Sequence, residues 1–387
     1  MKPTSYSLSG YGRMIIDRPR MDAYVQALKH AIQPGDVVLD IGTGTGIFAL
    51  LACQFGASKV YAIDPSDAIQ VGKEIAIANG YGDRIEFIQD ISTNIHLPEA
   101  VQVIVSDLRS VLPLFQHHIN AIVDARQRFL APNGILIPQC DQLWVSIITA
   151  PDFYQPYTSP WIESPYGINL QATHRFVTNA WKRIAIKPEH LLLKPQCSDT
   201  LHYSTISTPN YRTTLNWSVD REGTVHGIGI WFDTTLFEES GFSNAPDQPE
   251  LIYGNAFFPF SQPINLLPGD SLSLQLRANL VGDDYVWSWK TKVLEQGDPV
   301  HIKAHFQQST FFGEPRSPQQ LQQQSDRFVP TLNETGKIDH LILTLMEQSQ
   351  SLGAIAQQLA AQFPQRFPTH QVALTHVSEL SQRYSES

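Results

Sequence analysis

A glycine-rich turn between a hydrophobic run and a helical pattern constrains this chain more than any other feature. Val37–Asp40 reads as a buried strand, and Gly42, Gly44 and Gly46 follow it at alternate positions. Glycine lets a backbone turn tightly and approach a ligand closely, because it has no Cβ. A strand, a glycine turn and a helix in this order predict an α/β domain with a binding site at the turn.

An acidic residue in the next strand gives the glycine turn a partner. The predicted strand Lys59–Asp64 ends in a carboxylate that can accept hydrogen bonds from both hydroxyls of a ribose. The dinucleotide pattern Gly-x-Gly-x-x-Gly is not met, because Ile47 stands where its third glycine belongs. The motif therefore favours S-adenosylmethionine over NAD as the cofactor, and an ordinary tight turn is the simpler alternative.

The first third of the chain alternates β-rich runs with helical patterns, as in a parallel sheet with crossover helices. Apolar residues at helical spacing predict an opening helix from Met21 to Ile32. The strand candidates are Val37–Asp40, Lys59–Asp64, Ile85–Ile88, Val101–Val105 and Gly134–Ile137. We therefore predict a Rossmann-like, doubly wound α/β domain over residues 1–138.

The pattern changes from about residue 139 to strands in which apolar and polar residues alternate. Leu272, Leu274 and Leu276 give one example, and this period of two is typical of strands with one buried face. We predict a mainly antiparallel, β-barrel-like substrate domain over residues 139–313.

The last part of the chain returns to helical spacing after a polar break. Residues 314–325 are rich in Gln, have little to bury and are predicted to be a linker. Apolar stripes at helical spacing in residues 326–387 predict a small helical or winged-helix-like module. Ser351 and Thr369 are predicted to be N-caps of its helices.

Composition excludes several classes of protein. A net charge of −10 offers no general attraction for nucleic acid, and Cys53, Cys140 and Cys197 lack metal-ligand spacing, so no metal is expected. No apolar run is long enough to span a membrane, and Met1–Tyr6 lacks the apolar core of a signal peptide. We expect a soluble cytoplasmic protein without nucleic-acid or membrane partners.

Two segments of the chain resemble one enzyme family. Asp40–Gly46 resembles motif I of class I S-adenosylmethionine-dependent methyltransferases. Tyr11–Met14 and Asp17–Arg20 resemble the N-terminal, cofactor-covering segment of the protein arginine methyltransferase branch. The resemblance implies that Arg20 holds the methionyl carboxylate and that Met14 lies near the reactive sulfonium. The implied cofactor-binding residues are Tyr11, Arg20, Asp40, Gly42, Thr43, Gly44, Asp64, Pro65, Asp90, Ile91 and Ser106.

The adenine position is expected at the loop after the third strand. Asp90 can accept a hydrogen bond from the adenine amino group, and Ile91 can pack on the ring. The alternative is that Asp90 is only a solvated carboxylate at a strand end.

The loop from Ser106 to Gln116 corresponds to the substrate loop of the family, which carries two glutamates around a guanidinium. Here the two positions are Asp107 and Gln116, so the loop has half the expected charge. A guanidinium stays protonated in water and needs acidic groups to orient it. Asp107, Met14 and Gln116 are the catalytic candidates, with His117 or the neighbouring His118 as a base; the alternative for each histidine is a solvent-facing position.

Two further segments depart from the family. Its Thr-His-Trp segment is matched here by Leu251–Tyr253, so the imidazole is absent. The part that resembles its dimerisation arm is short between Tyr166 and Phe176, so a homodimer is possible but the usual ring dimer is doubtful.

The C-terminal module resembles the PqqD-like, leader-binding element of pathways that modify ribosomally made peptides. The resemblance rests on Asp326–Thr335 and on the apolar spacing that follows it. It implies that the module captures the leader of a precursor peptide, commonly by adding a strand to a sheet edge. A structural cap that packs on the barrel is the alternative.

Three functions remain open from the sequence. The first is a methyltransferase for a peptide or protein side chain other than arginine, acting on a precursor peptide. The second is a slow protein arginine N-methyltransferase, and the third is a non-catalytic peptide-binding or scaffolding protein. We rank them in this order because half of the expected substrate clamp is missing.

Overall fold

The computed structural model describes residues 7–296 and 301–385, so Met1–Tyr6, used above against a signal peptide, lies outside the described residues. The chain forms two compact units, Met1–Pro315 and Arg316–Ser387. Within the described residues, no helix combines the length and apolar character that a membrane crossing requires. The predicted methyltransferase and β domains both lie in the first unit.

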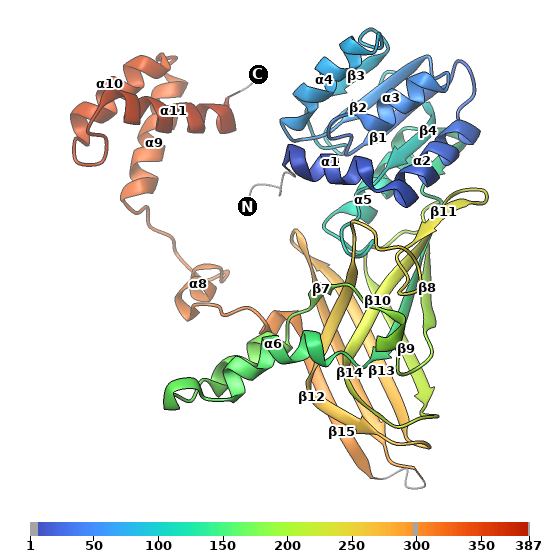
Figure 1. The fold of residues 1–387 in the computed structure, drawn as a ribbon. Helices are drawn as coiled ribbons and strands as arrows, with labels where there is room; N and C mark the ends of the chain where they lie inside the picture. The colour runs from blue at the N-terminus through green and yellow to red at the C-terminus, as the bar shows by residue number, and fades with distance from the viewer. Residues whose placement is uncertain (1–6, 297–300, 386–387) are drawn as a thin grey trace. The chain divides into compact units, whose positions relative to one another are not determined.

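The N-terminal half of the first unit is a parallel sheet with helices on both faces, as the sequence predicted (Figure 1). Its strand order is β3-β2-β1-β4-β5. The strands are β1 (Val37–Ile41), β2 (Lys59–Ile63), β3 (Ile85–Ile88), β4 (Val101–Ser106) and β5 (Leu130–Ile137). The helices are α1 (Leu8–Ile16), α2 (Arg18–Ala31), α3 (Ile47–Gln54), α4 (Ala68–Ala78) and α5 (His118–Arg128).

The register of the sheet brings the ends of three strands together. Ile41 at the end of β1 lies beside Ile63 of β2 and beside Ser106 of β4. The glycine turn, Asp64 and Asp107 therefore follow three adjacent strands at one edge. In open α/β sheets, ligands bind outside the carboxyl ends of the strands, and this edge is such a place.

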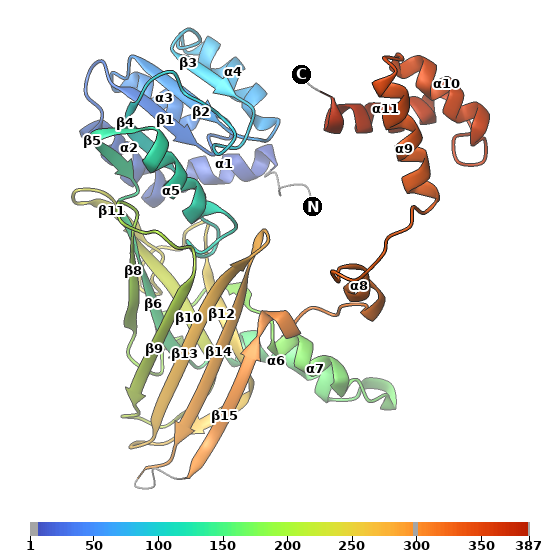
Figure 2. The same cartoon turned by 180° about the vertical axis from the view of Figure 1, so that it is seen from behind.

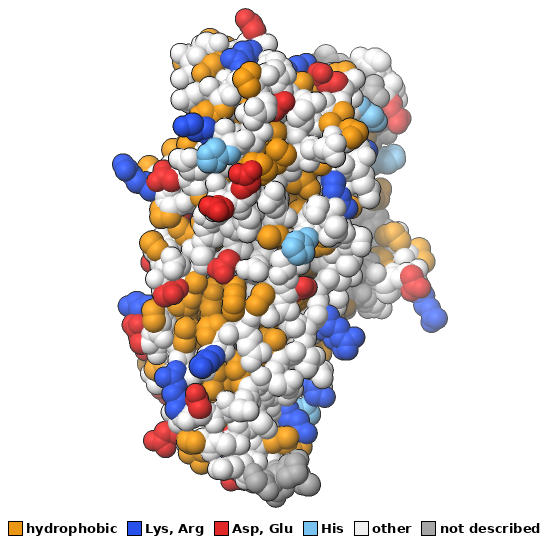
Figure 3. Space-filling model, turned by 90° about the vertical axis from the view of Figure 1, so that its right-hand side faces the viewer, with side chains coloured by type: hydrophobic (Ala, Val, Ile, Leu, Met, Phe, Trp, Pro, Cys, Tyr) orange, Lys and Arg blue, Asp and Glu red, His pale blue; other side chains and the backbone are white. Residues whose placement is uncertain are grey.

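The second half of the first unit is the predicted antiparallel β structure, in which two sheets face each other. One sheet has the order β7-β12-β10-β6-β8, with β11 paired to β10, and the other has the order β15-β14-β13-β9. The strands are β6 (Cys140–Ile148), β7 (Lys182–Ile184), β8 (Gln196–His202), β9 (Tyr211–Ser218), β10 (Gly223–Phe237), β11 (Ser240–Ser243), β12 (Asn255–Leu266), β13 (Ser271–Val281), β14 (Asp284–Leu294) and β15 (Ile302–Ser309). On the face in Figure 3, apolar side chains gather over part of the molecule, while charges of both signs are scattered around them.

The two halves share their packing where β5 passes into β6. Leu236 at the end of β10 is fully buried in the same apolar cluster as Tyr24 and Leu28 of α2. The Gln139 amide donates to the carbonyl of Thr235 at 2.9 Å. The barrel is therefore fixed against the cofactor half, and side chains from both halves can build one site.

A helical arm projects from the barrel (Figures 1 and 2). It consists of α6 (Pro151–Ile162), η1 (Pro165–Gly167), η2 (Gln171–Thr173) and α7 (His174–Thr178). Ile162, Tyr166 and Ile168 are 50%, 98% and 59% exposed. The short segment that the sequence indicated between Tyr166 and Phe176 is thus part of a longer helical arm with apolar side chains on its surface.

The second unit is helical and has its own core. Its helices are α8 (Pro318–Gln323), α9 (Glu334–Glu347), α10 (Leu352–Gln362) and α11 (His370–Tyr384). Ile342, Leu359 and Val377, from three helices, are fully buried together. The predicted N-caps are confirmed, since the hydroxyls of Ser351 and Thr369 accept hydrogen bonds from the amides of Ala354 and Val372.

One expectation for this module needs correction. No strand occurs in residues 316–385, so the part of the module that the structure describes has neither the wing of a winged helix nor a sheet edge. A leader peptide cannot be captured there by strand addition. The predicted linker also contains α8, which is exposed along its length.

Candidate functional site

The glycine turn after β1 has a backbone that few other residues can adopt. Gly42, Gly44 and Gly46 have φ angles of 75°, 53° and 84°, in the left-handed region. A Cβ on Gly44 would lie 2.3 Å from the ring of Tyr11, and one on Gly42 would lie 2.4 Å from the side chain of Leu108. The turn is therefore a cradle that side chains would fill, with α1 on one side and the loop after β4 on the other.

Two carboxylates fix this turn. Asp40 is fully buried, and its Oδ2 accepts from the Thr43 hydroxyl at 2.6 Å and the Ala49 amide at 3.1 Å. Burial raises the pKa of Asp40 to about 7, although these hydrogen bonds act in the opposite direction. Asp64 accepts from the Gly44 amide at 2.8 Å and from the Ser66 amide at 2.8 Å.

The cradle offers hydrogen-bond acceptors that suit the ribose of S-adenosylmethionine. Each carboxylate oxygen of Asp64 accepts one of these backbone hydrogen bonds and has a second lone pair for a hydroxyl. The sequence predicted the grouping of Gly42, Thr43, Gly44 and Asp64, and the structure places all four at one turn.

The remaining predicted cofactor residues surround the same edge. Pro65 is exposed and Ser106 is buried, with its carbonyl accepting from the Tyr24 hydroxyl at 3.1 Å. Asp90 Oδ1 accepts from the Ile91 amide at 2.7 Å and from the Asn94 side chain at 3.0 Å, in a local turn. Ile91 is 48% exposed, so its apolar side chain is available to a flat ring.

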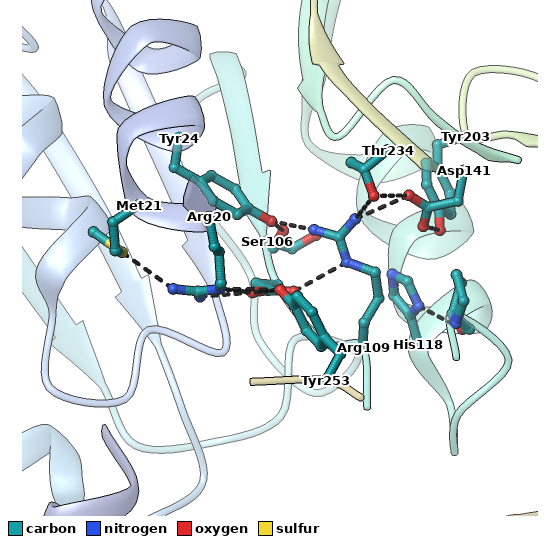
Figure 4. Close-up of polar contacts among 12 residues, drawn as sticks. Arg20, Met21, Tyr24, Ser106, Arg109, His118, Asp141, Tyr203, Thr234 and Tyr253 are labelled. Carbon is teal, nitrogen blue, oxygen red and sulfur yellow. Dashed lines mark hydrogen bonds and ion pairs between the residues drawn. The ribbon is translucent and has the colours of Figure 1, made fainter. Parts of the chain in front are cut away.

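A buried ion pair joins α2 to the loop after β4. The Nη2 and Nε atoms of Arg20 donate to Asp107 Oδ2 at 2.6 and 2.8 Å, and its Nη1 donates to the Met14 carbonyl at 3.1 Å. The Tyr253 hydroxyl donates to the same carboxylate oxygen at 2.6 Å (Figure 4). Tyr253 belongs to the segment that matches the family's Thr-His-Trp. In this chain that segment contributes a phenol hydroxyl to Asp107.

A second arginine takes the other oxygen of Asp107. The Nε of Arg109 donates to Asp107 Oδ1 at 3.0 Å, and its Nη1 donates to Asp141 Oδ1 at 2.9 Å. Burial by itself would raise the pKa of Asp107, but the charges of Arg20 and Arg109 outweigh it and lower the pKa to about 2. Asp107 is therefore a paired anion and a weak base.

The histidines and Gln116 lie at the far end of this loop. His117 is about half exposed, and its Nε2 lies 3.1 Å from Asp283 Oδ1 in the turn after β13. In this structure the imidazole therefore contacts a surface carboxylate. His118 is buried, bonds through Nδ1 to the Pro113 carbonyl at 2.8 Å, and has its pKa lowered by burial. Gln116 has a left-handed backbone with φ 42°.

Sequence reasoning missed four residues of this network. Arg109, Tyr24, Asp141 and Tyr253 come from four separate segments, and the structure brings them to one place. Arg109 carried a local signal, because it stands two positions after Asp107 in the loop after β4. Tyr253 lies in the segment that matches the family's Thr-His-Trp, which marked the position but not the contact with Asp107. Nothing near Tyr24 or Asp141 in sequence points to this site.

Comparisons with known proteins agree with this geometry. The family described as ribosomal protein L11 methyltransferase (PrmA) matches residues 21–149, the segment from α2 to the end of β6. A probable protein arginine N-methyltransferase 6 from Arabidopsis thaliana is 29% identical over 313 residues, covering 77% of this chain and 71% of the relative.

Solved structures share the fold at lower identity. Protein arginine methyltransferase 10 of Arabidopsis thaliana superposes with a TM-score of 0.69 and 24% identity, covering 79% of this chain and 97% of that one. The PRMT1 enzyme-prozyme complex of Trypanosoma brucei, solved with AdoHcy, gives 0.69 and 21%, covering 77% and 96%. With the glycine cradle and Asp64, the sequence matches support an S-adenosylmethionine-dependent methyltransferase, and the solved structures show that it shares the fold of the protein arginine methyltransferases.

Proposed function

We propose that this enzyme methylates a side chain of a peptide or protein, without the two-carboxylate grip that an arginine acceptor requires. The relatives named above are protein arginine methyltransferases, which supports a polypeptide substrate. One observation supports an acceptor other than arginine. Both carboxylate oxygens of Asp107 already accept hydrogen bonds from Arg20, Arg109 and Tyr253. Gln116 cannot replace the missing charge.

The chain's own residues would orient the cofactor. S-adenosylmethionine supplies a methyl group that its positive sulfonium already activates, so the protein mainly provides position. We assign the ribose to Asp64, the methionyl carboxylate to Arg20 and the adenine to Asp90 and Ile91, while Met14 lies beside the reacting group. Arg20 has five N–H donors, and Nε and Nη2 already bind Asp107 while Nη1 binds the Met14 carbonyl, so the methionyl carboxylate would take the remaining Nη hydrogens.

Slow arginine methylation is the second candidate, because relatives of this chain are protein arginine N-methyltransferases. It requires Asp107 to exchange one of its present partners for the substrate. Mass spectrometry of a methylated substrate distinguishes the two functions, because fragmentation assigns the added methyl group to arginine or to another residue. A methyl group found only on arginine would contradict our first proposal.

The C-terminal unit is proposed to hold a part of the substrate peptide other than the methylated side chain. It is separately compact, and Phe328, Val329 and Leu332 before α9 are 37%, 81% and 57% exposed. These apolar side chains could contact the leader of a ribosomally made precursor peptide, in place of the strand addition excluded above. Tethering raises the local concentration of the acceptor and can strengthen a weak grip.

Deleting residues 316–387 tests this role. We expect kcat/KM for a long precursor encoded near this gene to fall by about 100-fold or more, because the tether is lost. The Kd for S-adenosylhomocysteine, measured by calorimetry, should stay within about twofold, since the cofactor residues lie in the other unit. A short core peptide without the leader is the control, and its turnover should not change. Equal loss of cofactor affinity and turnover would show that the unit is a structural cap.

The arm is proposed to support a homodimer. Replacing Tyr166 and Ile168 together by aspartate should weaken self-association more than tenfold, because each is an exposed apolar side chain that a partner would bury, at about 1.5–3 kcal/mol per side chain. Sedimentation at several concentrations gives the Kd. Ile77→Asp is the matched control, since Ile77 is 71% exposed on α4, outside the arm. A wild-type protein that stays monomeric at high concentration would refute the proposal.

A further inference from the structure

The guanidinium of Arg109 lies in a fully enclosed polar site. Its side chain has no exposed surface, although it comes from a loop at the cofactor edge. Nε bonds to Asp107, and Nη1 bonds to Asp141 Oδ1 and to the Thr234 hydroxyl at 2.7 Å (Figure 4). Nη2 donates to the hydroxyl of Tyr24. Every nitrogen of the group therefore has an oxygen partner.

Aromatic rings surround the same group. The central carbon of the guanidinium lies 5.2 Å from the ring centre of Phe242, 5.7 Å from Phe232 and 5.9 Å from Tyr253. Rings within about 6 Å attract a cation through their quadrupole. Two carboxylates combined with several rings are the surroundings that a receptor for a free guanidinium would need. In this protein the guanidinium that fills these surroundings is not a ligand but the side chain of Arg109.

The charges around this site are balanced without a substrate. Arg20 and Arg109 are paired with Asp107 and Asp141, and all four side chains are at least nine-tenths buried. His118 packs nearby, and its Nε2 has no hydrogen-bond partner among the described residues. The hydroxyls of Tyr24, Tyr203 and Tyr253 add no charge. Bound S-adenosylmethionine would add an ammonium and a sulfonium together with the carboxylate assigned to Arg20, so it leaves no negative charge to spare. A cationic acceptor brought to Asp107 would therefore find no unpaired carboxylate, and an unpaired buried charge is strongly unfavourable.

We propose that the side chain of Arg109 permanently occupies the site formed by Asp107, Asp141 and the surrounding rings, which we call the guanidinium clamp. By filling this clamp, Arg109 restricts the methyl acceptor to uncharged side chains. Arg109 is then a specificity-determining residue that excludes arginine and protonated lysine. The restriction on the acceptor rests on the proposed function, whereas the occupancy of the clamp can be tested without any substrate.

An uncharged acceptor must have a lone pair that can attack the methyl group without prior deprotonation. Asp107 is engaged by two guanidinium groups and is a poor proton acceptor, so a side chain that needs prior deprotonation gains little from it. A neutral imidazole has a free ring nitrogen at neutral pH and is the first candidate. Its lone pair forms the bond to the methyl carbon, the carbon–sulfur bond breaks with its electron pair on sulfur, and the imidazole proton leaves to water.

Chemical rescue tests the occupancy of the clamp. Arg109→Ala removes the internal guanidinium, and methylguanidinium at about five times its Kd should then raise the melting temperature of the first unit by about 1–2 °C. The wild-type protein should show no such shift. Arg128→Ala is the matched control, because Arg128 is an exposed arginine of α5 that binds Asp124 and the carbonyls of Ser92 and Ile95, and not the carboxylates that surround Arg109. If Arg109→Ala does not fold by itself, the same variant is refolded with methylguanidinium present, where we expect the fold to be recovered, whereas an equal concentration of NaCl should not recover it. Failure of methylguanidinium to recover the fold contradicts the assignment.

Two further outcomes of the rescue overturn the assignment. One is an equal shift in the wild-type protein or in Arg128→Ala, because binding would then not depend on an emptied clamp. The other is a folded variant at residue 109 that gains no stability from methylguanidinium.

Methyl transfer tests the restriction on the acceptor. Peptides identical except for one His, Gln or Arg are incubated with the full-length enzyme and labelled S-adenosylmethionine. We expect transfer to His at a rate at least tenfold above that to Gln or Arg, because the lone pair of an amide nitrogen is delocalised and is not free to attack. Comparable labelling of the Arg peptide overturns the restriction. No labelling of any peptide contradicts the proposed function itself, and the rescue experiment then still decides whether Arg109 fills the clamp.

Discussion

Replacing Asp107 by alanine is expected to lower the free energy of unfolding of the first unit by about 3–5 kcal/mol at pH 7. The substitution leaves Arg20 and Arg109 buried without their shared carboxylate, and removal of one partner from a buried ion pair typically has this effect. Denaturant titration, followed by the fluorescence of the barrel tryptophans, measures the change. Methyl transfer should be lost as well, since Arg20 would no longer be held beside the glycine turn.

The matched control is Asp283→Ala. Asp283 is a carboxylate with 90% of its side chain exposed, and among the described residues its ion-pair partner is the half-exposed His117. We expect a change within about 0.5 kcal/mol there, as at most surface positions. A loss below about 1 kcal/mol for Asp107→Ala would show that the two arginines find other partners and that the network is not rigid.

The same carboxylate makes stability depend on pH in the acid range. The folded pKa of Asp107 is about 2, below the value of 3.8 that is usual for a free aspartate. Because the folded pKa is the lower one, the stabilisation is complete above about pH 4 and is lost as the pH falls from about 4 to about 2. The shift corresponds to about 2 kcal/mol. Asp107→Asn should lack this part of the pH profile while keeping the size of the side chain.

Replacing Asp64 by alanine is expected to weaken the binding of S-adenosylhomocysteine by about 100-fold or more. Two ribose hydrogen bonds to a charged acceptor would be lost, at about 1.5–3 kcal/mol each. The Gly44 amide also loses the carboxylate that positions the turn. Calorimetric titration of the wild-type and variant proteins gives both affinities.

Asp67→Ala is the control for this substitution. Asp67 is an exposed carboxylate three positions further along, and it accepts from the side chain of Gln89 rather than from the glycine turn. Its removal should leave the Kd within about twofold. If Asp64→Ala bound the ligand as tightly as the wild-type protein, the ribose would have to be held elsewhere, and the assignment of the cradle would be wrong.

The parallel sheet and the cofactor turn were predictable because their signals are local. A buried strand reads as a continuous apolar run, and Gly44 is required by a backbone φ of 53° that depends on its immediate neighbours. Asp64 follows by the same logic, since the next parallel strand ends at the same edge. The N-caps Ser351 and Thr369 likewise depend only on residues three positions away.

The contacts made by the residues on the substrate side of the site were not predictable from local patterns. The loop after β4 shows Asp107 as a surviving acidic residue, but its availability depends on Arg20, Arg109 and Tyr253, up to 146 positions away. His117 stands beside this loop in sequence, yet its recorded partner is Asp283, 166 positions further along. Short-range patterns carry no information about such pairs.

The sequence by itself determined the α/β cofactor half, the alternating strands of the barrel, the C-terminal helices and the identity of the cofactor. Each of these depends on hydrophobic period, turn geometry or capping within a few residues. Only the tertiary structure decided which charges meet at Asp107. Burial removes water from that site, and an internal cation such as Arg109 is then stable only where distant carboxylates and rings converge on it.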